Sequence, residues 1–246
     1  MPPWIAGVDG CPKGWIVALS RLDDPGAVGF RLVPDFAAVL AVSERPAIVA
    51  VDMPVGLPDR VERGGRRAEV LVRPLLGRLG ASVFPTSVRA VVEAPAYGEA
   101  IALARSGLQP FAPSPFANAI VPRIRQIDAL LRADPALRGR VYEVHPELAF
   151  WTLNGERPLD HRKKTPAGLD ERRALLGRGG IPAPVTEGIP PKGAKTDDML
   201  DALAALVVAR AIAAGRGRPY PDPPEIDAHG IPAAIWTFAG ANNSVP

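Results

Sequence analysis

The sequence has few of the residues that stabilise secreted proteins or bind zinc. Cys11 is the only cysteine among 246 residues, which excludes an internal disulfide and favours the reducing cytoplasm as the location. No apolar run approaches the roughly 20 residues that a membrane-spanning helix needs, so we expect no membrane partner. Residues 1–10 also lack the basic stretch and long apolar segment that are typical of a secretory signal.

Arginine dominates the charged residues. Of the 29 basic residues 24 are arginine, and the formal net charge at pH 7 is +3. Guanidinium groups suit phosphate contacts, so this excess is consistent with a polyanion-binding surface. Alanine, proline and glycine are abundant as well, and a coding sequence rich in G and C would produce the same composition. Composition alone therefore leaves both explanations open.

The first part of the chain predicts a three-stranded antiparallel meander, followed by a helix and a central strand. Short apolar segments separated by turns of Gly, Pro and Asp are typical of a meander. The run AIVAVDMPVGLP is β-branched and does not alternate, which favours a strand that is buried on both faces. We expect strands at 4–9, 14–22, 28–34 and 47–58, and a helix at 35–44 with Asp35 as its N-cap.

Residues 59–140 have a different pattern, which predicts a helical insertion between the central strand and the next one. The 47 % of hydrophobic residues allows one large or two small domains. The order of the expected elements favours a single α/β domain over residues 1–246. The remaining expected elements are helices at 59–80, 97–107 and 118–137 within the insertion, a strand in RVYEVHPELAF (140–150), helices at 170–180 and 195–215, and a loop with a final edge strand at 218–238.

Acidic residues recur at places where a charge is costly. Asp9 ends the first strand and Asp52 ends the central strand, and a buried carboxylate must find a partner, a proton or a metal. Neighbouring parallel strands bring their carboxyl ends to one edge, where open α/β sheets place their sites. Asp198 and Asp201 are three residues apart on the long helix and share one face. We therefore expect Asp9 to lie within metal-bridging distance of Asp52, with Asp198 or Asp201 closing the cluster.

The segment VYEVHPE contributes further candidates. A spacing of two residues on a strand puts Glu143 and His145 on the same face, so both should project into the cleft of Asp9. Pro146 cannot donate to a sheet ladder and should end the strand. Glu147 would then begin the following segment, and we do not expect it to be a ligand.

Clustered carboxylates repel one another unless a cation neutralises them. Oxygen ligands with few histidines and no cysteine pair favour Mg²⁺ or Mn²⁺ over zinc. Two such ions activate water and stabilise the leaving oxygen in phosphodiester cleavage. The pattern thus predicts a site for two ions. Its expected ligands are Asp9, Asp52, Asp198 and Asp201, and its expected catalytic partners in proton transfer are Glu143 and His145.

These residues also have structural explanations. A glycine follows Asp9, so this aspartate could simply shape a turn. Asp197 and Asp198 could cap the long helix and interact with its dipole, although this would not explain Asp201 one turn further along. A lone histidine such as His145 is usually packed or hydrogen bonded. The alternatives stay open for each residue taken separately.

Six motifs occur in order from about residue 4 to about residue 238: GVDGCPKGW, AVDMPVGLP, SVFPTS, YEVHPELAF, HRKKT and DDMLDALAA. They resemble the successive motifs of the domain-of-unknown-function four-two-nine family. Members of that family are described as predicted RNase H-like nucleases related to the Holliday junction resolvases. The resemblance implies the RNase H-like fold, in which helices flank a five-stranded mixed sheet made of an antiparallel meander and parallel strands.

The resemblance also implies roles for single residues. Asp9 is similar to the first-strand acid of RNase H-like nucleases, and Asp52 to an acid at the end of the family's next parallel strand. Asp198 and Asp201 resemble the D-x-x-D pair on the last helix of the resolvases. Glu143 corresponds to the acid of the EVHPE motif, for which the resemblance implies no defined role. Resolvases usually carry a glutamate near the fourth strand, whereas here an aspartate precedes Met-Pro.

We therefore expect a metal-dependent nuclease whose partner is nucleic acid. A phosphotransferase or ATPase of the same superfamily is an alternative, although such enzymes need two copies of the fold. A non-catalytic protein that binds a cation or nucleic acid is another, and the oligomeric state is open. Basic residues would contact phosphates, unless they only form a solvated helix face. The expected substrate contacts are Arg63, Arg66, Arg67, Lys163 and Lys164.

Overall fold

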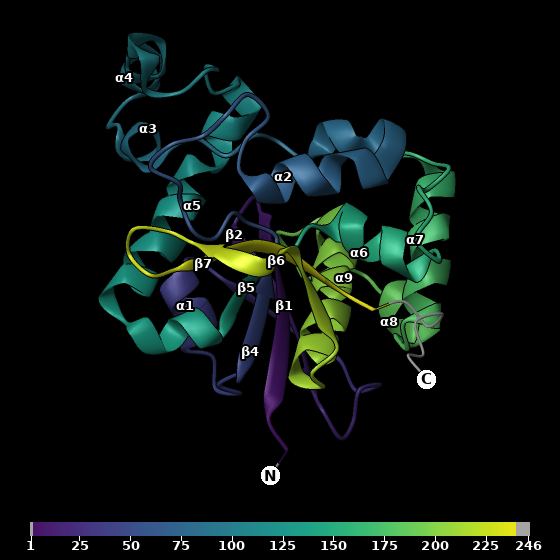
Figure 1. Ribbon diagram of the computed structural model, residues 1–246. Helices are drawn as coiled ribbons and strands as arrows, with labels where there is room; N and C mark the ends of the chain where they lie inside the picture. Colours follow the sequence, from purple (N-terminus) through teal and green to yellow (C-terminus); the bar gives the residue numbers. More distant parts are fainter. Residues whose placement is uncertain (1, 240–246) are drawn as a thin grey trace.

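A five-stranded mixed sheet forms the centre of the computed structural model, which describes residues 2–239 (Figure 1). Its strands lie in the order β3-β2-β1-β4-β5. The first three form an antiparallel meander, whereas β4 pairs in parallel with both β1 and β5. This arrangement confirms the expected α/β class and is consistent with an RNase H-like fold. The strands are β1 (Trp4–Cys11), β2 (Gly14–Arg21), β3 (Gly29–Val33), β4 (Ile48–Val51) and β5 (Val141–Glu143).

Helices cover both faces of this sheet. Side chains alternate along a strand, so Ile5 of β1 packs beneath α9 (Thr196–Ala213) while Val8 packs on the opposite face. Helices α1 (Phe36–Leu40) and α5 (Pro115–Ala133) lie on that opposite face (Figure 1). Because apolar contacts fill both faces, polar side chains gather at the ends of the strands.

Helix α9 lies directly against β1 because Gly7 has no side chain. A Cβ atom at Gly7 would lie 2.1 Å from Leu206 N and 2.2 Å from Ala202 O, so a larger residue would push the helix away. Asp201 is adjacent to this contact in the sequence, and Asp9 lies two residues beyond Gly7. The close approach of helix and strand therefore also brings these two carboxylates together.

Residues 59–140 lie between β4 and β5 and are largely helical, as expected. The helix expected at 59–80 begins late, because Gly64 and Gly65 adopt φ values of 124° and 101°, which a regular helix does not allow. The long helix α5 of this region packs against the sheet and belongs to the main core. The segments are α2 (Arg67–Val72), a 3₁₀ helix (Arg73–Ser82), α3 (Arg89–Glu93), α4 (Tyr97–Leu103), a π-type turn (Ala104–Leu108), α5 and a second 3₁₀ helix (Pro135–Gly139).

The C-terminal part differs from the expected loop and edge strand. β6 (Gly217–Ile226) and β7 (Pro232–Phe238) pair as an antiparallel hairpin. This hairpin is a separate two-stranded sheet, which an isolated bridge between Val144 and Trp236 links to the main sheet. It crosses above the ends of the central strands (Figure 1). The remaining helices are α6 (Pro146–Leu153), α7 (Pro166–Arg178) and α8 (Ala183–Thr186).

Within residues 2–239, none of the helices combines the length and the apolar character that crossing a membrane requires.

Candidate functional site

Three of the expected metal ligands line one cavity: Asp9, Asp52 and Asp201. Asp9 shares the α9 face of β1 with Ile5, and Asp52 follows Ala50 on the same face of β4. Asp201 comes from α9 itself and is only 2 % exposed. The parallel pairing of β1 with β4 and the close packing of α9 on β1 thus bring together residues that lie far apart in the sequence.

This cluster concentrates negative charge in a buried place. Burial raises the pKa of Asp9 well above its usual value, and the carboxylates of Asp52 and Asp201 raise it further. Asp9 Oδ1 accepts a hydrogen bond from Gly10 N at 2.7 Å. Burial also raises the pKa of Asp52 to about 6, although the nearby His145 opposes this increase. The carboxylates therefore resist simultaneous ionisation unless a cation is present.

Lys163 brings an ammonium group to the same cluster. Its Nζ donates to Asp201 Oδ2 at 2.8 Å, while 40 % of the lysine side chain stays exposed. Burial lowers the pKa of Lys163, but the carboxylates of the cluster, Asp201 first, raise it more, and its pKa ends above the usual value. We expected Lys163 to be a surface contact for phosphate, and the structure instead holds it beside the acids. Asp201 Oδ1 has no hydrogen-bond partner among residues 2–239.

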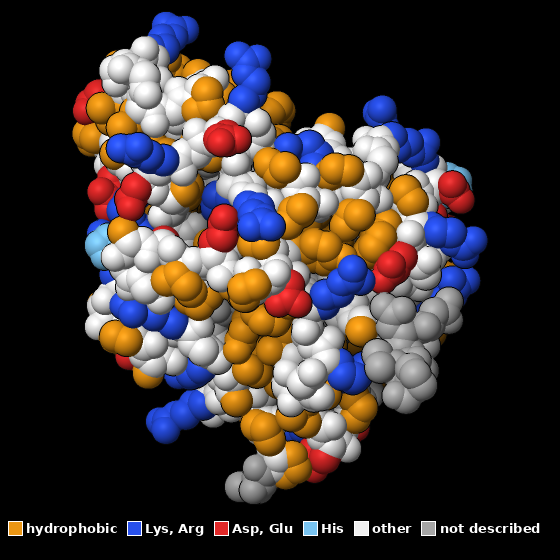
Figure 2. Space-filling model, viewed as in Figure 1, with side chains coloured by type: hydrophobic (Ala, Val, Ile, Leu, Met, Phe, Trp, Pro, Cys, Tyr) orange, Lys and Arg blue, Asp and Glu red, His pale blue; other side chains and the backbone are white. Residues whose placement is uncertain are grey.

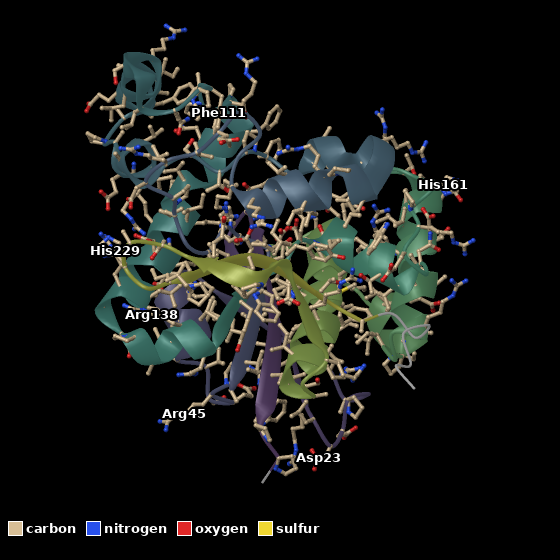
Figure 3. The ribbon with its side chains drawn as sticks, viewed as in Figure 1. Asp23, Arg45, Phe111, Arg138, His161 and His229 are labelled. Carbon is tan, nitrogen blue, oxygen red and sulfur yellow. The ribbon has the colours of Figure 1, made fainter. Side chains whose placement is uncertain are left out.

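His145 lies at the start of α6 and also lines the cavity. Its Nε2 is 3.4 Å from Ser82 O, and its buried Nδ1 has no partner in the part of the chain that the structure describes. The spacing argument that linked it to Glu143 does not hold, because β5 ends before His145. His161 and His229 are exposed at opposite sides of the molecule (Figure 3). Of the three histidines, His145 is the one at the acidic cluster.

Glu143 lies on the other face of the sheet from Asp9. It pairs with Val51 of β4, and Val51 faces the core of α1 and α5. Its carboxylate accepts hydrogen bonds from Val55 N and Arg66 Nη2, both at 2.7 Å. Burial raises the pKa of Glu143 to about 7, which Arg66 opposes. Glu143 lines the cavity together with Asp9 and His145, although it points to the opposite face of the sheet from Asp9.

Arg66 does not have the surface position that a phosphate contact requires. It is only 4 % exposed, and its Nε donates to Glu69 Oε1 at 2.7 Å. Its Nη1 donates to Val55 O at 2.7 Å and Gly56 O at 3.0 Å, while Nη2 binds Glu143. Two buried carboxylates need a paired cation, and this need explains the inward position. We therefore revise the expectation for Arg66 to a structural role.

Glu147 and Asp198 are also bound by other groups. Glu147 accepts two hydrogen bonds from Arg172 Nη2, at 2.6 and 2.7 Å. Asp198 Oδ2 accepts from Lys195 N at 2.9 Å at the start of α9, which is the capping role that the sequence left as an alternative. Asp198 is partly exposed and lies at the margin of the cluster. Its pKa is raised by burial and by the neighbouring Asp197 and Asp201 carboxylates.

Arg63, Arg67 and Lys164 are exposed, as a contact with phosphate requires. Arg63 precedes α2, Arg67 begins it, and Lys164 lies just before α7. On the face drawn in Figure 2, Lys and Arg side chains are spread around a central hydrophobic area rather than gathered in one stripe. These residues are accessible to a ligand.

The cavity has a volume of about 360 Å³ and two kinds of wall. The sheet and α9 supply the acidic wall already described. The helical region between β4 and β5 supplies an apolar wall. Its apolar lining includes Phe84, Val91, Val92, Ile120 and Val121.

The chemistry of the acidic wall fits a hard divalent cation. Its donors are carboxylate oxygens, one of which, Asp201 Oδ1, is buried and unpartnered, and Mg²⁺ and Mn²⁺ prefer such ligands. However, no group of three or more His, Cys, Asp or Glu side chains within residues 2–239 is already closed around a metal position. Lys163 provides the positive charge at Asp201 instead. A cation would have to draw the carboxylates closer together.

Arg123 was not a sequence candidate, yet it lines the same cavity. Its Nη2 donates to Cys11 O at 2.7 Å, and its guanidinium carbon lies 5.8 Å from the centre of the Trp15 ring. This places α5 against the turn that follows Asp9. An arginine on a helix is not distinctive in a chain with 24 arginines, so the sequence contained no signal for it.

Comparison with known proteins identifies a family but no relative of known function. The model of a family described as "Protein of unknown function (DUF429)" matches residues 7–226. No curated protein and no solved structure matches the chain. The matched region contains Asp9, Asp52 and Asp201 together with the helical region between β4 and β5. Because the match covers well over half of the sequence, the chain belongs to the DUF429 family of proteins of unknown function.

Proposed function

We propose that this protein is a metal-dependent nuclease, which hydrolyses phosphodiester bonds of nucleic acid with Mg²⁺ or Mn²⁺. The observation that carries the proposal is the meeting of Asp9, Asp52 and Asp201 in one cavity at the ends of two parallel strands. These carboxylates have the ammonium group of Lys163 beside them. When all three are ionised, two negative charges remain unbalanced. A divalent cation is the partner that suits such an oxygen-only set.

The charge of the cluster bears on the number of ions. One divalent ion balances the two surplus charges, so a second would enter with the negative charge of the substrate phosphate. Asp9, Asp52 and Asp201 would hold these ions, with Asp198 at the margin. When bound, such ions activate water and stabilise the leaving oxygen.

The residues of the chain itself would orient the phosphate and move the proton. Lys163 Nζ is partly exposed and would donate to a non-bridging phosphate oxygen. In the tautomer in which His145 Nε2 donates to Ser82 O, Nδ1 is an acceptor. We assign His145 as the residue that takes the proton of the attacking water, while the water oxygen bonds to phosphorus and the bond from phosphorus to the leaving strand breaks.

The exposed basic residues would hold the flanking phosphates. Arg63, Arg67 and Lys164 are accessible, and contacts of this kind release counterions when nucleic acid binds. Binding should therefore weaken steeply as salt increases. We place the reaction in the cytoplasm because Cys11 is the only cysteine of the chain.

The deciding experiment is a cleavage assay on labelled single-stranded, duplex, DNA–RNA hybrid and branched nucleic acids, with Mn²⁺, with Mg²⁺ and with EDTA. We expect cleavage only with a divalent cation, and a loss of at least about a hundredfold in Asp9→Asn. Asp24→Asn is the matched control, because Asp24 is exposed in the loop between β2 and β3 and does not line the cavity. Circular dichroism should show both variants folded.

Three outcomes would contradict the proposal. Equal cleavage by wild type and Asp9→Asn would identify a contaminating nuclease. Binding of Mn²⁺ without cleavage of any substrate would favour a non-catalytic cation-binding protein. Turnover of ATP, measured in parallel, would favour a phosphotransferase or ATPase, although residues 2–239 contain one copy of the five-stranded sheet.

A further inference from the structure

The apolar wall of the cavity has no part in the chemistry proposed above. It consists of side chains from α3, α5 and the loop before α3, which lie across from the strand ends that carry the acids. Figure 1 shows α3 and α4 as a lobe above that end of the sheet. A site that only cleaved the sugar–phosphate backbone of a duplex would have no use for an apolar chamber beside its carboxylates.

Phe84 marks the mouth of this chamber. It lines the cavity and yet is 41 % exposed, so one side of its ring contacts the chamber and the rest meets solvent. Further inside, the lining is aliphatic, from Val91, Val92 and Ile124, all of which are buried. An exposed aromatic ring in front of an aliphatic chamber provides a surface on which a flat ring can stack.

Two polar groups accompany these apolar side chains. Arg123 lines the cavity, and beyond its bond to Cys11 O its guanidinium has no hydrogen bond or ion pair among the described residues. Asn118, one turn earlier on α5, lines the cavity too, and its side-chain amide forms no hydrogen bond within residues 2–239. A cation suits a phosphate, and an amide with both donors and an acceptor suits the edge of a base.

We propose that the cavity accepts one unstacked nucleotide unit, with its base in the apolar chamber and its phosphate at the acidic wall. Phe84 stacks on the base, Asn118 faces its edge, and Arg123 with Lys163 contacts the phosphates. This inference rests on the proposed nuclease function and narrows its substrate to a strand end, an extruded residue or a free nucleotide. These three sources share the same chemistry.

The size of the cavity supports this assignment over a duplex. Its volume of about 360 Å³ is within the range of sites for single small molecules, roughly 300–1,000 Å³. A base inside a duplex stays stacked and paired, and it must leave the stack before it can enter such a pocket. A single-stranded end does not have to break these interactions, so it should bind more tightly than the matching blunt duplex.

The test measures binding and cleavage separately. Fluorescence anisotropy in EDTA compares a labelled single strand with a blunt duplex of the same sequence, and a nucleoside monophosphate serves as competitor. We expect the single strand to bind at least about tenfold more tightly. Phe84→Ala should weaken single-strand binding about tenfold, as loss of one stacked base does. Phe116→Ala is the matched control, because Phe116 is 75 % exposed on α5 and does not line the cavity.

If the monophosphate competes with the single strand, a free nucleotide is sufficient to occupy the cavity. If it does not compete while the single strand binds tightly, the ligand of the cavity is a strand end or an extruded residue. Both results support the inference. Equal binding of single strand and duplex, or equal effects of Phe84→Ala and Phe116→Ala, would overturn it. The cleavage assay tests the nuclease function independently. Asp9-dependent cleavage at internal sites of a duplex would support the nuclease function and contradict this inference. Absence of all cleavage would overturn the function even if the binding preference is found.

Discussion

Two groups of buried carboxylates in this protein have opposite surroundings. Glu143 and Glu69 share the guanidinium of Arg66, and Glu147 has Arg172 to itself. Asp128 and Asp227 similarly share Arg89. The second group, Asp9, Asp52 and Asp201, has a partly exposed lysine, which forms an ion pair with Asp201. Every carboxylate of the first group has an ion pair with an arginine, whereas Asp9 and Asp52 of the second group line a cavity and have no ion pair among the described residues.

The difference separates carboxylates whose ion pairs stabilise the fold from carboxylates that lower its stability. Removing one partner of a buried ion pair strongly destabilises the folded protein, because the other partner is left buried without a counter-charge. A buried carboxylate that has no ion pair already lowers the free energy of unfolding. Replacing it with a neutral residue should therefore raise that free energy. Strain of this kind is typical of functional sites. Removing the arginine of an ion pair in the first group should therefore lower the stability of the protein, whereas neutralising Asp52 in the second group should raise it.

The largest effect is expected at Arg66. Arg66→Met leaves Glu69 and Glu143 buried without their cation, and we expect the free energy of unfolding to fall by about 3–5 kcal/mol. Urea denaturation followed by circular dichroism measures this change. Arg67→Met is the matched control, since the adjacent Arg67 is exposed, and it should change stability by less than about 0.5 kcal/mol. Equal effects of the two variants would contradict the structural role of Arg66.

A smaller effect is expected at Lys163. Lys163→Met removes the partner of Asp201 and should lower the free energy of unfolding in EDTA by about 2 kcal/mol, less than at a fully buried pair because the lysine is partly solvated. Added Mn²⁺ should then raise the melting temperature more than it does in the wild type, because a bound cation replaces the lost charge. Lys164→Met, at the exposed neighbour, is the control. A melting temperature of Lys163→Met that does not respond to Mn²⁺ would argue against cation binding at the cluster.

An effect of the opposite sign is expected at Asp52. Its pKa of about 6 in the folded protein lies above the value near 3.9 of an unfolded chain. The folded state therefore holds the proton more tightly, and wild-type stability falls as pH rises from about 4 to about 6 and stays lower above that. Asp52→Asn lacks this loss, so in EDTA it should be more stable than wild type at pH 7.5, by at most about 3 kcal/mol, because one unit of pKa difference corresponds to about 1.4 kcal/mol.

Urea denaturation of Asp52→Asn and wild type at several pH values measures this difference. It should be near zero at pH 4, grow through pH 5 and 6, and then level off. Asp24→Asn, in an exposed turn, should show no such trend. A stability difference between Asp52→Asn and wild type that shrinks as pH rises would mean that the fold stabilises Asp52 as a carboxylate. Asp52 would then resemble the ion-paired carboxylates of the first group.

Much of the fold could be predicted because its signals are local. The turns around Gly14 and Pro25, the β-branched run before Asp52 and the long apolar helix each depend on neighbouring residues, and the sheet and α9 agree with them. The errors occurred where distant segments compete. Residues 217–226 became a strand because β7 offers a pairing partner, and β5 ended at Glu143, where Val144 bridges instead to Trp236 of the hairpin.

The sequence by itself determined which acids stand at the strand ends and on the face of the last helix, because strand and helix periodicity dictate those positions. It could not determine which acids form ion pairs. Arg66 is 77 residues from Glu143, and Lys163 is 38 residues from Asp201. An ion pair needs contact at about 3 Å, and only the folded chain brings such distant side chains that close. The tertiary structure therefore decided that Glu143 has an ion pair within the framework, while Asp9 and Asp52 line the cavity with no ion pair among the described residues.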